Sequence, residues 1–299
     1  MSLININSKN IYYEEYGEHN KHTIVYFHGG PGEGCWSYVH QAKILGEKYH
    51  VVIFDQYGVL RSDTIPENES CGVADHVEMI DKMRNELGIE KWTVLGHSYG
   101  GMLACLYAYT YPNNIRAVIY DNPTWNWTLT ARTIASALIP YFQKTNNDEL
   151  LNICSKILDE NTSAKETYDS INDLFTGNDE EIDKYLHVIS MDVYNQYMEK
   201  HSLRVNVDDW QKYKIHTQKL IDKGDFFNDY IPCLKDIKVS SLLMVGEHDI
   251  TCGKDQQGYF RDMTPNGTFV EFQNSAHLLW IQEQEAYTKT IIDFLDTVE

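Results

Sequence analysis

Segment 92–105 constrains the fold of this chain more than any other stretch. Its apolar residues 92–95 predict a short strand, and residues 102–109, rich in Ala and Leu, predict a buried helix. Between them stands Gly96-His-Ser98-Tyr-Gly100, a Gly-x-Ser-x-Gly pentapeptide. A serine on a one-residue turn between strand and helix adopts strained backbone angles, so its neighbours must be small. The pattern predicts that Ser98 is a nucleophile raised above the end of the strand.

A simple Gly- and Ser-containing loop is the alternative interpretation, because such pentapeptides also arise by chance. The strand before the motif and the helix after it are the context that the nucleophile requires. Gly96, Gly100 and Gly101 give the turn its clearance, and the N-terminal dipole of the helix favours developing negative charge. The context therefore favours a catalytic serine.

A second Gly-rich loop, His28-Gly-Gly-Pro-Gly32, follows the apolar run 23–27. Small residues let backbone N–H groups turn toward a ligand, and a loop after an early strand supplies half of the oxyanion hole in hydrolases with this serine turn. We expect Gly30 to be the donor, with Gly29 as fallback, and Tyr99 to supply the second N–H. An ordinary tight turn is the alternative for this loop.

A serine nucleophile needs a histidine base and a carboxylate that orients it, in the chain order Ser, acid, His. Asp249 follows the predicted strand 239–245 within Gly246-Glu-His-Asp249, so it is the predicted acid. Glu247 is the rival acid.

The predicted base is His277, which lies between the last predicted strand, 268–272, and the closing helix, 278–295. Among the 12 histidines, only this one has the required order and location. Three other histidines are expected near the site: His28, His97 and His248. The predicted triad is therefore Ser98, Asp249 and His277.

The remaining pattern predicts an α/β core with eight strands flanked by helices. The expected strands are 3–6, 10–16, 23–27, 51–54, 92–95, 115–120, 239–245 and 268–272, with helices at 37–49 and 73–87. Residues 124–229 are helical in pattern, polar and Tyr-rich, with an acidic cluster at 178–182. We interpret them as a helical cap inserted into a core formed by residues 1–123 and 230–299. Asp55 and Arg61 are expected to brace a loop as an ion pair.

The formal net charge of −19, from 44 acidic and 25 basic side chains, argues against a nucleic-acid partner, because phosphates are bound by clustered Lys and Arg. An acidic field would favour a substrate with a free amine, although solubility alone also explains an acidic protein. The expected partner is a small molecule or short peptide, and the expected assembly is a monomer or small homo-oligomer.

Six cysteines without paired spacing predict free thiols in a reducing compartment. The N-terminus lacks a secretory signal pattern, and no apolar stretch reaches the roughly 18–20 residues that span a membrane, so a cytoplasmic enzyme is expected. No His-Glu-x-x-His and no Gly-x-Gly-x-x-Gly after a strand is present. Neither a metal nor a cofactor is predicted.

These motifs together resemble the proline iminopeptidase family of α/β-hydrolases, which includes the tricorn-interacting aminopeptidases. The matching segments are His28-Gly-Gly-Pro-Gly32, Asp55-Gln56-x-Gly58-x-x-x-Ser62, Gly96-His-Ser-Tyr-Gly-Gly101, Gly246-x-x-Asp249 and His277. The resemblance spans the catalytic core. It implies an α/β-hydrolase fold with a mostly parallel eight-stranded sheet and a helical cap over the site. It also implies release of an N-terminal residue, often proline, from short peptides.

Two segments depart from the family pattern. The usual Asp-Gln-Arg-Gly-x-Gly-x-Ser is here Asp55-Gln-Tyr-Gly-Val-Leu-Arg-Ser62. Family members bind the substrate amine with glutamates, one of which directly follows the catalytic Asp in the tricorn branch; here that position is Ile250. The Trp-x-x-Trp-Glu stretch that other branches use is not found. Substitute carboxylates are Glu166, Glu180, Glu181 and Glu199, although a solvated helix face also explains each of them.

The predicted substrate contacts are Gly29, Trp125 and Glu199, and the first functional hypothesis is an aminopeptidase acting on small peptides or amino-acid amides. A carboxylesterase or lactonase with the same triad is the alternative. It is favoured by Ile250 and by the aromatic residues of the cap: Trp125, Trp127, Tyr141 and Trp210. A binding protein that keeps the fold without turnover is disfavoured by the intact triad, and an Asp-nucleophile hydrolase by Ser98.

Overall fold

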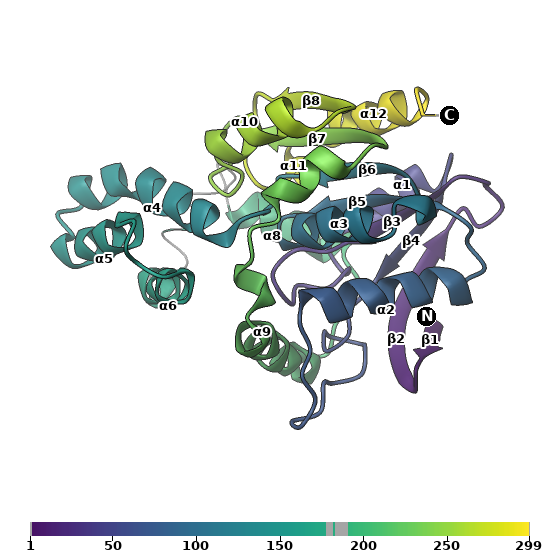
Figure 1. Cartoon of the computed structure of the whole chain (residues 1–299), viewed down its shortest axis with the longest axis horizontal. Helices are drawn as coiled ribbons and strands as arrows, with labels where there is room; N and C mark the ends of the chain where they lie inside the picture. Colours follow the sequence, from purple (N-terminus) through teal and green to yellow (C-terminus); the bar gives the residue numbers. More distant parts are fainter. Residues whose placement is uncertain (1, 178–181, 183–190, 299) are drawn as a thin grey trace.

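The computed structural model describes residues 2–177, 182 and 191–298. Its centre is an eight-stranded sheet in the order β1-β2-β4-β3-β5-β6-β7-β8 (Figure 1). Neighbours from β4 to β8 pair in parallel, whereas β1 and β2 are antiparallel. The strands are β1 (Ser2–Ile6), β2 (Lys9–Tyr16), β3 (Thr23–Phe27), β4 (His50–Phe54), β5 (Trp92–His97), β6 (Ile115–Asp121), β7 (Ser240–Gly246) and β8 (Gly267–Phe272). The predicted fold class is confirmed.

Helices cover both faces of the sheet, because side chains of successive strand residues point to opposite faces. In β3, Val25 and Phe27 pack with α2 and α3 on one face, whereas Ile24 and Tyr26 pack with α1 and α12 on the other. The flanking helices are α1 (Val39–Leu45), α2 (Val73–Glu86), α3 (Tyr99–Thr110), α10 (Lys254–Met263), α11 (Leu279–Gln282) and α12 (Gln284–Leu295). Short 3-10 turns lie at η1 (Pro112–Asn114) and η4 (Ile231–Asp236).

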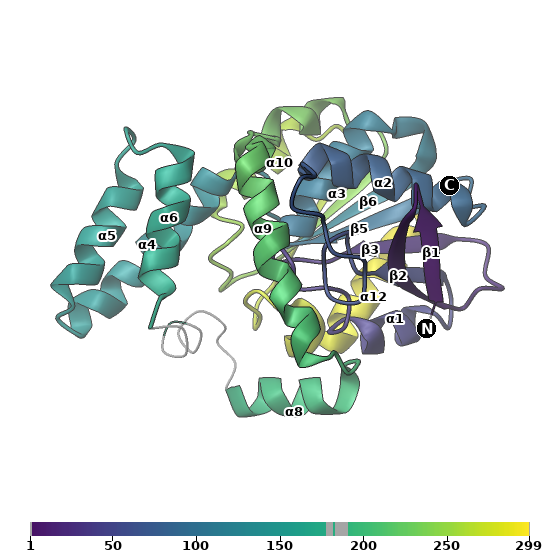
Figure 2. The same ribbon diagram turned by 90° about the horizontal axis from the view of Figure 1, so that it is seen from below.

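Between residues 124 and 229 the described residues form helices and no strand. The helices are α4 (Trp127–Lys144), α5 (Asp148–Leu158), α6 (Ala164–Phe175), α8 (Met191–His201) and α9 (Lys212–Lys223), with 3-10 turns at η2 (Val207–Gln211) and η3 (Asp225–Phe227). Helices α4 to α6 enclose an apolar cluster of their own and project beside the sheet (Figures 1 and 2). Of the acidic cluster at 178–182, only Ile182 is among the described residues.

The C-terminal segment differs from the single helix that we expected over residues 278–295. It forms α11 and α12, which are separated at Glu283, where φ is −131°. The Glu283 carboxylate accepts hydrogen bonds from the N–H of Asn274 at 2.9 Å and the hydroxyl of Ser275 at 2.7 Å. The break therefore turns this carboxylate onto the loop that leads to His277.

Two further sequence expectations can be compared with the structure. All six cysteines are free, as their spacing predicts. None of the helices among the described residues is both long and apolar enough to cross a membrane.

Asp55 and Arg61 form a buried, two-pronged ion pair at the end of β4. The guanidinium Nε lies 2.7 Å from Oδ2 and its Nη2 lies 2.8 Å from Oδ1 of the carboxylate. The same carboxylate accepts backbone N–H groups of Cys35 and Arg61 at 2.8 and 3.1 Å. Because Cys35 follows the Gly-rich loop 28–34, the pair ties that loop to the segment after β4, as predicted.

We predict that Arg61→Met lowers the free energy of unfolding by about 3–5 kcal/mol, because it leaves the Asp55 charge buried without a partner. The Asp55 side chain is 0% and that of Arg61 12% exposed. Urea unfolding followed by circular dichroism measures the change. Lys165→Met is the control, since its ion pair with Asp169 is exposed and should change stability by less than about 1 kcal/mol. Equal effects of the two substitutions would contradict the bracing role.

Candidate active site

Ser98 is the single residue between β5, which ends at His97, and α3, which begins at Tyr99. Its φ of +53° and ψ of −120° are an unusual conformation for a residue with a side chain, and such strain costs on the order of 1–3 kcal/mol. The Ser98 N–H donates to the carbonyl of Asp121 at 3.0 Å, and its own carbonyl accepts from Thr124 N–H at 2.9 Å. The strained turn is therefore held by the end of neighbouring β6.

Close packing requires glycine beside the turn. A methyl group at Gly100 would lie 2.0 Å from the carbonyl oxygen of Phe27 at the end of β3, and one at Gly96 would lie 2.3 Å from the Gly100 oxygen. Real side-chain carbons do not approach backbone oxygens so closely. The glycines thus let α3 start directly against β3 and β5, as the sequence pattern predicts.

The structure brings His277 and Asp249 together. The Nδ1 atom of His277 lies 2.8 Å from Oδ1 of Asp249, whose side chain is fully buried while that of His277 is 17% exposed. The rival acid, Glu247, and its neighbour His248 both have exposed side chains. The geometry favours Asp249 as the orienting carboxylate.

The environment of Asp249 stabilises its ionised form. Burial alone would raise the pKa of this carboxyl, but the charge of and the hydrogen bond from His277, the Cys252 N–H at 2.7 Å and the Thr251 hydroxyl at 2.9 Å together lower it. The Thr251 Oγ1 also lies 3.0 Å from Nδ1 of His277. Sequence reasoning missed Thr251, which no motif marks.

Asn122 joins the acid strand to the histidine loop. It follows β6 with a φ of +41°. Its side-chain oxygen accepts the N–H of Gly246 at 2.9 Å, and its amide nitrogen donates to the carbonyls of Ala276 and His277, each at 3.0 Å. One buried amide thereby sets the spacing between the segments that carry Asp249 and His277. Only its place after a buried strand could have pointed to this role.

The Gly-rich loop lies beside the nucleophile. A methyl group at Gly29 would be 3.1 Å from Cβ of Ser98 and 3.0 Å from Cδ2 of His97, so this predicted substrate contact adjoins the turn. Gly30 has a φ of +110°. Within the described residues, the N–H groups of Gly30 and Tyr99 donate to no protein acceptor. Their role as oxyanion donors stays a prediction.

His28 and His97 are buried and support the site from within. Burial lowers the pKa of His28 to about 4, and the neutral ring accepts the N–H of Gln56 at 3.1 Å. The ring of His97 lies 4.6 Å from that of His277 and 4.5 Å from that of Trp280. Burial acts to lower the pKa of His97, but the nearby Asp121 raises it overall. Neither side chain is open to a substrate.

Two of the predicted substrate contacts are not supported by their positions. Trp125 is 0% exposed and lies in the core between Tyr120 and Phe260, where it offers no surface to a ligand. Glu199 is exposed on α8, as expected for a solvated helix face. Glu166 is also exposed and caps α6, whereas residues 180 and 181 lie outside the described residues.

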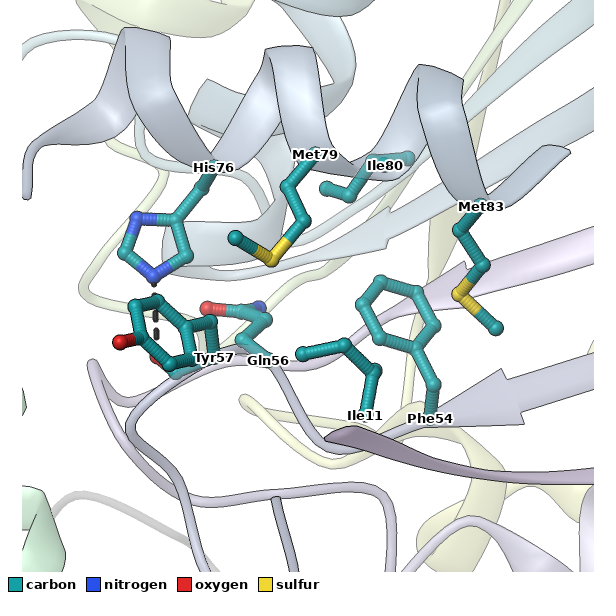
Figure 3. A pocket seen from close by; sticks show the side chains of 8 residues that line it. All are labelled: Ile11, Phe54, Gln56, Tyr57, His76, Met79, Ile80 and Met83. Carbon is teal, nitrogen blue, oxygen red and sulfur yellow. Dashed lines mark hydrogen bonds between the residues drawn. The ribbon is translucent and has the colours of Figure 1, made fainter. Parts of the chain in front are cut away.

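A narrow pocket lies elsewhere, between α2 and the segments around β2 and β4 (Figure 3). The Nε2 atom of His76 faces the carbonyl of Tyr57 at 3.1 Å there. The lining residues are Ile11, Phe54, Gln56, Tyr57, His76, Met79, Ile80 and Met83. None of the predicted site residues is among them. No cluster of three or more metal-ligating side chains occurs in the described part of the chain.

Comparison with known proteins identifies the class. Residues 22–284 match the model of the family described as alpha/beta hydrolase fold, so the chain belongs to this family. Within this family, the chain is similar to proline iminopeptidases.

Similarity to individual proteins extends over nearly the whole chain. The chain is 25% identical over 304 residues to a proline iminopeptidase of Heyndrickxia coagulans, covering 99% of this chain and 98% of that protein. It is 27% identical over 307 residues to one of Saccharolobus solfataricus, covering 97% and 90%. The solved structure of a proline iminopeptidase-related protein from Thermus thermophilus superimposes with a TM-score of 0.78 at 19% identity, covering 99% and 97%. At that identity it shows the fold alone.

We predict that Asp249→Asn lowers kcat by about 10⁴-fold, the loss known for removing the charge of an orienting carboxylate. Initial rates on an activated ester measure the effect. The matched control is Glu247→Gln, which removes an exposed carboxylate two residues away and should retain most activity. A larger loss in Glu247→Gln than in Asp249→Asn would reverse the assignment of the acid.

Asn122→Gly should lower kcat roughly 10- to 100-fold, because the spacing between the acid and histidine segments is then no longer set by a side chain. Glycine keeps the positive φ accessible, so backbone strain does not confuse the result. Asn146→Gly is the control, since Asn146 also has a positive φ, +54°, and its side chain is exposed. Circular dichroism first establishes that both variants are folded, and their rates are then compared. An unchanged kcat in Asn122→Gly would refute the positioning role.

Proposed function

We propose that the chain is an acyl-transferring serine hydrolase in which Ser98 attacks a carbonyl carbon while His277 removes its proton. Asp249 holds the imidazole in the correct tautomer and stabilises the imidazolium. The N–H groups of Gly30 and Tyr99 stabilise the tetrahedral oxyanion, each donor contributing about 3–4 kcal/mol. His277 then protonates the leaving group, and water hydrolyses the acyl-enzyme.

The observation that carries this proposal is the 2.8 Å contact between His277 and the buried Asp249, at the sheet edge where the strained Ser98 turn also lies. The acid follows β7, the base follows β8, and the nucleophile follows β5. Because carboxyl ends of parallel strands meet at one edge of a sheet, three distant segments contribute to one site.

We further propose that the substrate is a small peptide or amino-acid amide with a free N-terminal amine, and that the enzyme releases its first residue as prolyl aminopeptidases do. What supports this is the similarity of almost the entire chain to proline iminopeptidases, together with the His28-Gly-Gly-Pro-Gly32 loop. A serine acyl-enzyme mechanism suits such a substrate, since the scissile amide is an acyl derivative.

A carboxylesterase or lactonase acting on small uncharged acyl groups is the second candidate. It is favoured by Ile250, which directly follows the predicted acid and is packed against the apolar cluster of α4 to α6. An apolar side chain at this position offers no counter-charge to a substrate amine.

We predict that the wild-type enzyme cleaves prolyl or alanyl p-nitroanilide faster than their N-acetylated forms, with a difference of at least about 10-fold, because a free ammonium group contributes binding energy. Release of p-nitroaniline measures turnover. Ser98→Ala is the blank and should lose activity by roughly 10⁴-fold or more.

Hydrolysis of p-nitrophenyl acetate and butyrate is measured in parallel. Serine-dependent cleavage of esters without cleavage of free-amine anilides would replace the aminopeptidase proposal by the esterase candidate. Turnover by Ser98→Ala equal to wild type would overturn the nucleophile assignment itself.

A further inference from the structure

Glu33 is a carboxylate beside the nucleophile that the family motifs do not include. It directly follows His28-Gly-Gly-Pro-Gly32 in the chain. A methyl group placed on Gly29 would lie 3.3 Å from Oε2 of Glu33 and 3.1 Å from Cβ of Ser98. Both atoms therefore lie beside the same face of Gly29, which places the Glu33 carboxylate near the side chain of Ser98.

The Glu33 carboxylate is held at one oxygen and open at the other. The hydroxyl of Ser37 donates to Oε1 at 3.0 Å, and the residue is partly buried. Among the described residues, no Lys or Arg forms an ion pair with Glu33, and its carboxylate accepts a hydrogen bond only at Oε1, from Ser37. A partly buried carboxylate with no Lys or Arg beside it attracts a cation from outside the protein.

The loop that carries Glu33 is fixed from both sides. The Nδ1–H of the His28 ring donates to the carbonyl of Gly29 at 2.9 Å, and the N–H of Cys35 donates to buried Asp55 at 2.8 Å. On the outer side, a methyl group at Gly32 would lie 2.8 Å from Cβ of Tyr213 on α9. The carboxylate is therefore presented by a rigid segment, which is what a binding group requires.

The geometry points to Glu33 as the residue that binds the N-terminal ammonium group of the substrate. In an amino-acid amide, the amine nitrogen lies only about 2.5 Å from the carbonyl carbon, because two bonds separate them. When that carbon is in contact with Ser98, the ammonium group must lie within a few ångströms of the nucleophile. The space between Ser98 and Oε2 of Glu33 is on that scale.

This assignment rests on the proposed aminopeptidase function and adds its specificity. It explains how a chain with Ile250 after the predicted acid, and with exposed Glu166 and Glu199, recognises an amine. The same loop also carries the predicted oxyanion donor, Gly30. A bare carboxylate there opposes the negative charge of a tetrahedral intermediate, and a bound ammonium group neutralises it. For substrates without the amine, the Glu33 charge therefore destabilises the tetrahedral intermediate and slows the reaction.

The test compares wild type with Glu33→Gln, which keeps an oxygen that can accept from Ser37 and removes the charge. We expect kcat/KM for prolyl p-nitroanilide to fall about 10- to 100-fold, the range for losing a hydrogen bond to a charged group. Hydrolysis of p-nitrophenyl acetate should be unchanged or faster. Glu33→Asp should recover part of the loss, and Glu199→Gln is the matched control. Equal losses on ester and anilide, or a loss on neither, would overturn the assignment.

A second measurement does not depend on peptide cleavage. Pyrrolidine carries a ring ammonium group and no carbonyl, and tetrahydrofuran is an uncharged ring of the same size. Both are tested as competitive inhibitors of p-nitrophenyl acetate hydrolysis. Pyrrolidine should inhibit wild type at least about 10-fold more strongly than Glu33→Gln, while inhibition by tetrahydrofuran stays equal.

These results separate the two proposals. Inhibition by pyrrolidine that depends on Glu33, in an enzyme that cleaves no anilide, would keep the ammonium site and refute the aminopeptidase function. Anilide cleavage with pyrrolidine inhibition equal in both proteins would keep the aminopeptidase and refute Glu33 as its amine-binding residue.

Discussion

The site depends on one steric constraint, the close approach of the first turn of α3 to the ends of β3 and β5. The 2.0 Å that would separate a Gly100 methyl group from the Phe27 oxygen leaves no room for any side chain. That packing holds Ser98 in a conformation it would not adopt alone. The Ser98 backbone is hydrogen-bonded to Asp121 and Thr124 as well as to Gly101 in the first turn of α3. The strain is compensated by the buried core on both faces of the sheet.

The other site segments are positioned by polar side chains that reach between loops. Asn122 links the Asp249 and His277 segments, and the break between α11 and α12 directs Glu283 onto the same histidine loop. Asp55 fixes the far end of the Gly-rich loop. Loops at a sheet edge have few apolar contacts of their own, so buried hydrogen bonds give the precision that packing gives in the core.

The strands of the sheet, and the chain order of the candidate nucleophile, acid and base, could be predicted from the sequence because they follow from local patterns. Apolar runs of four to seven residues mark buried strands, and the Gly-x-Ser-x-Gly spacing has one mechanical explanation. It did not predict Thr251, Asn122 or the break at Glu283, because their roles depend on which distant backbone groups need a partner. Trp125 was expected to contact substrate since aromatic residues gather in the segment 124–229, but it is buried against Phe260 and exposes no surface. An aromatic composition does not distinguish a core from a cleft.

Charge shows the same contrast between composition and position. A net charge of −19 suggests attraction for an amine, yet carboxylates such as Glu166 and Glu199 are exposed on helices, where salt screens their field beyond about 10 Å. Glu33 differs because it is partly buried, lacks a basic partner among the described residues, and shares its loop with the predicted oxyanion donor. Solvent and salt therefore weaken its electric field only little at the adjacent site. We therefore expect one carboxylate at that position to discriminate between an ammonium group and a neutral acyl chain more effectively than the whole surface field, since negative charge develops on the reacting carbonyl oxygen in the transition state and interacts most strongly with the nearest charge.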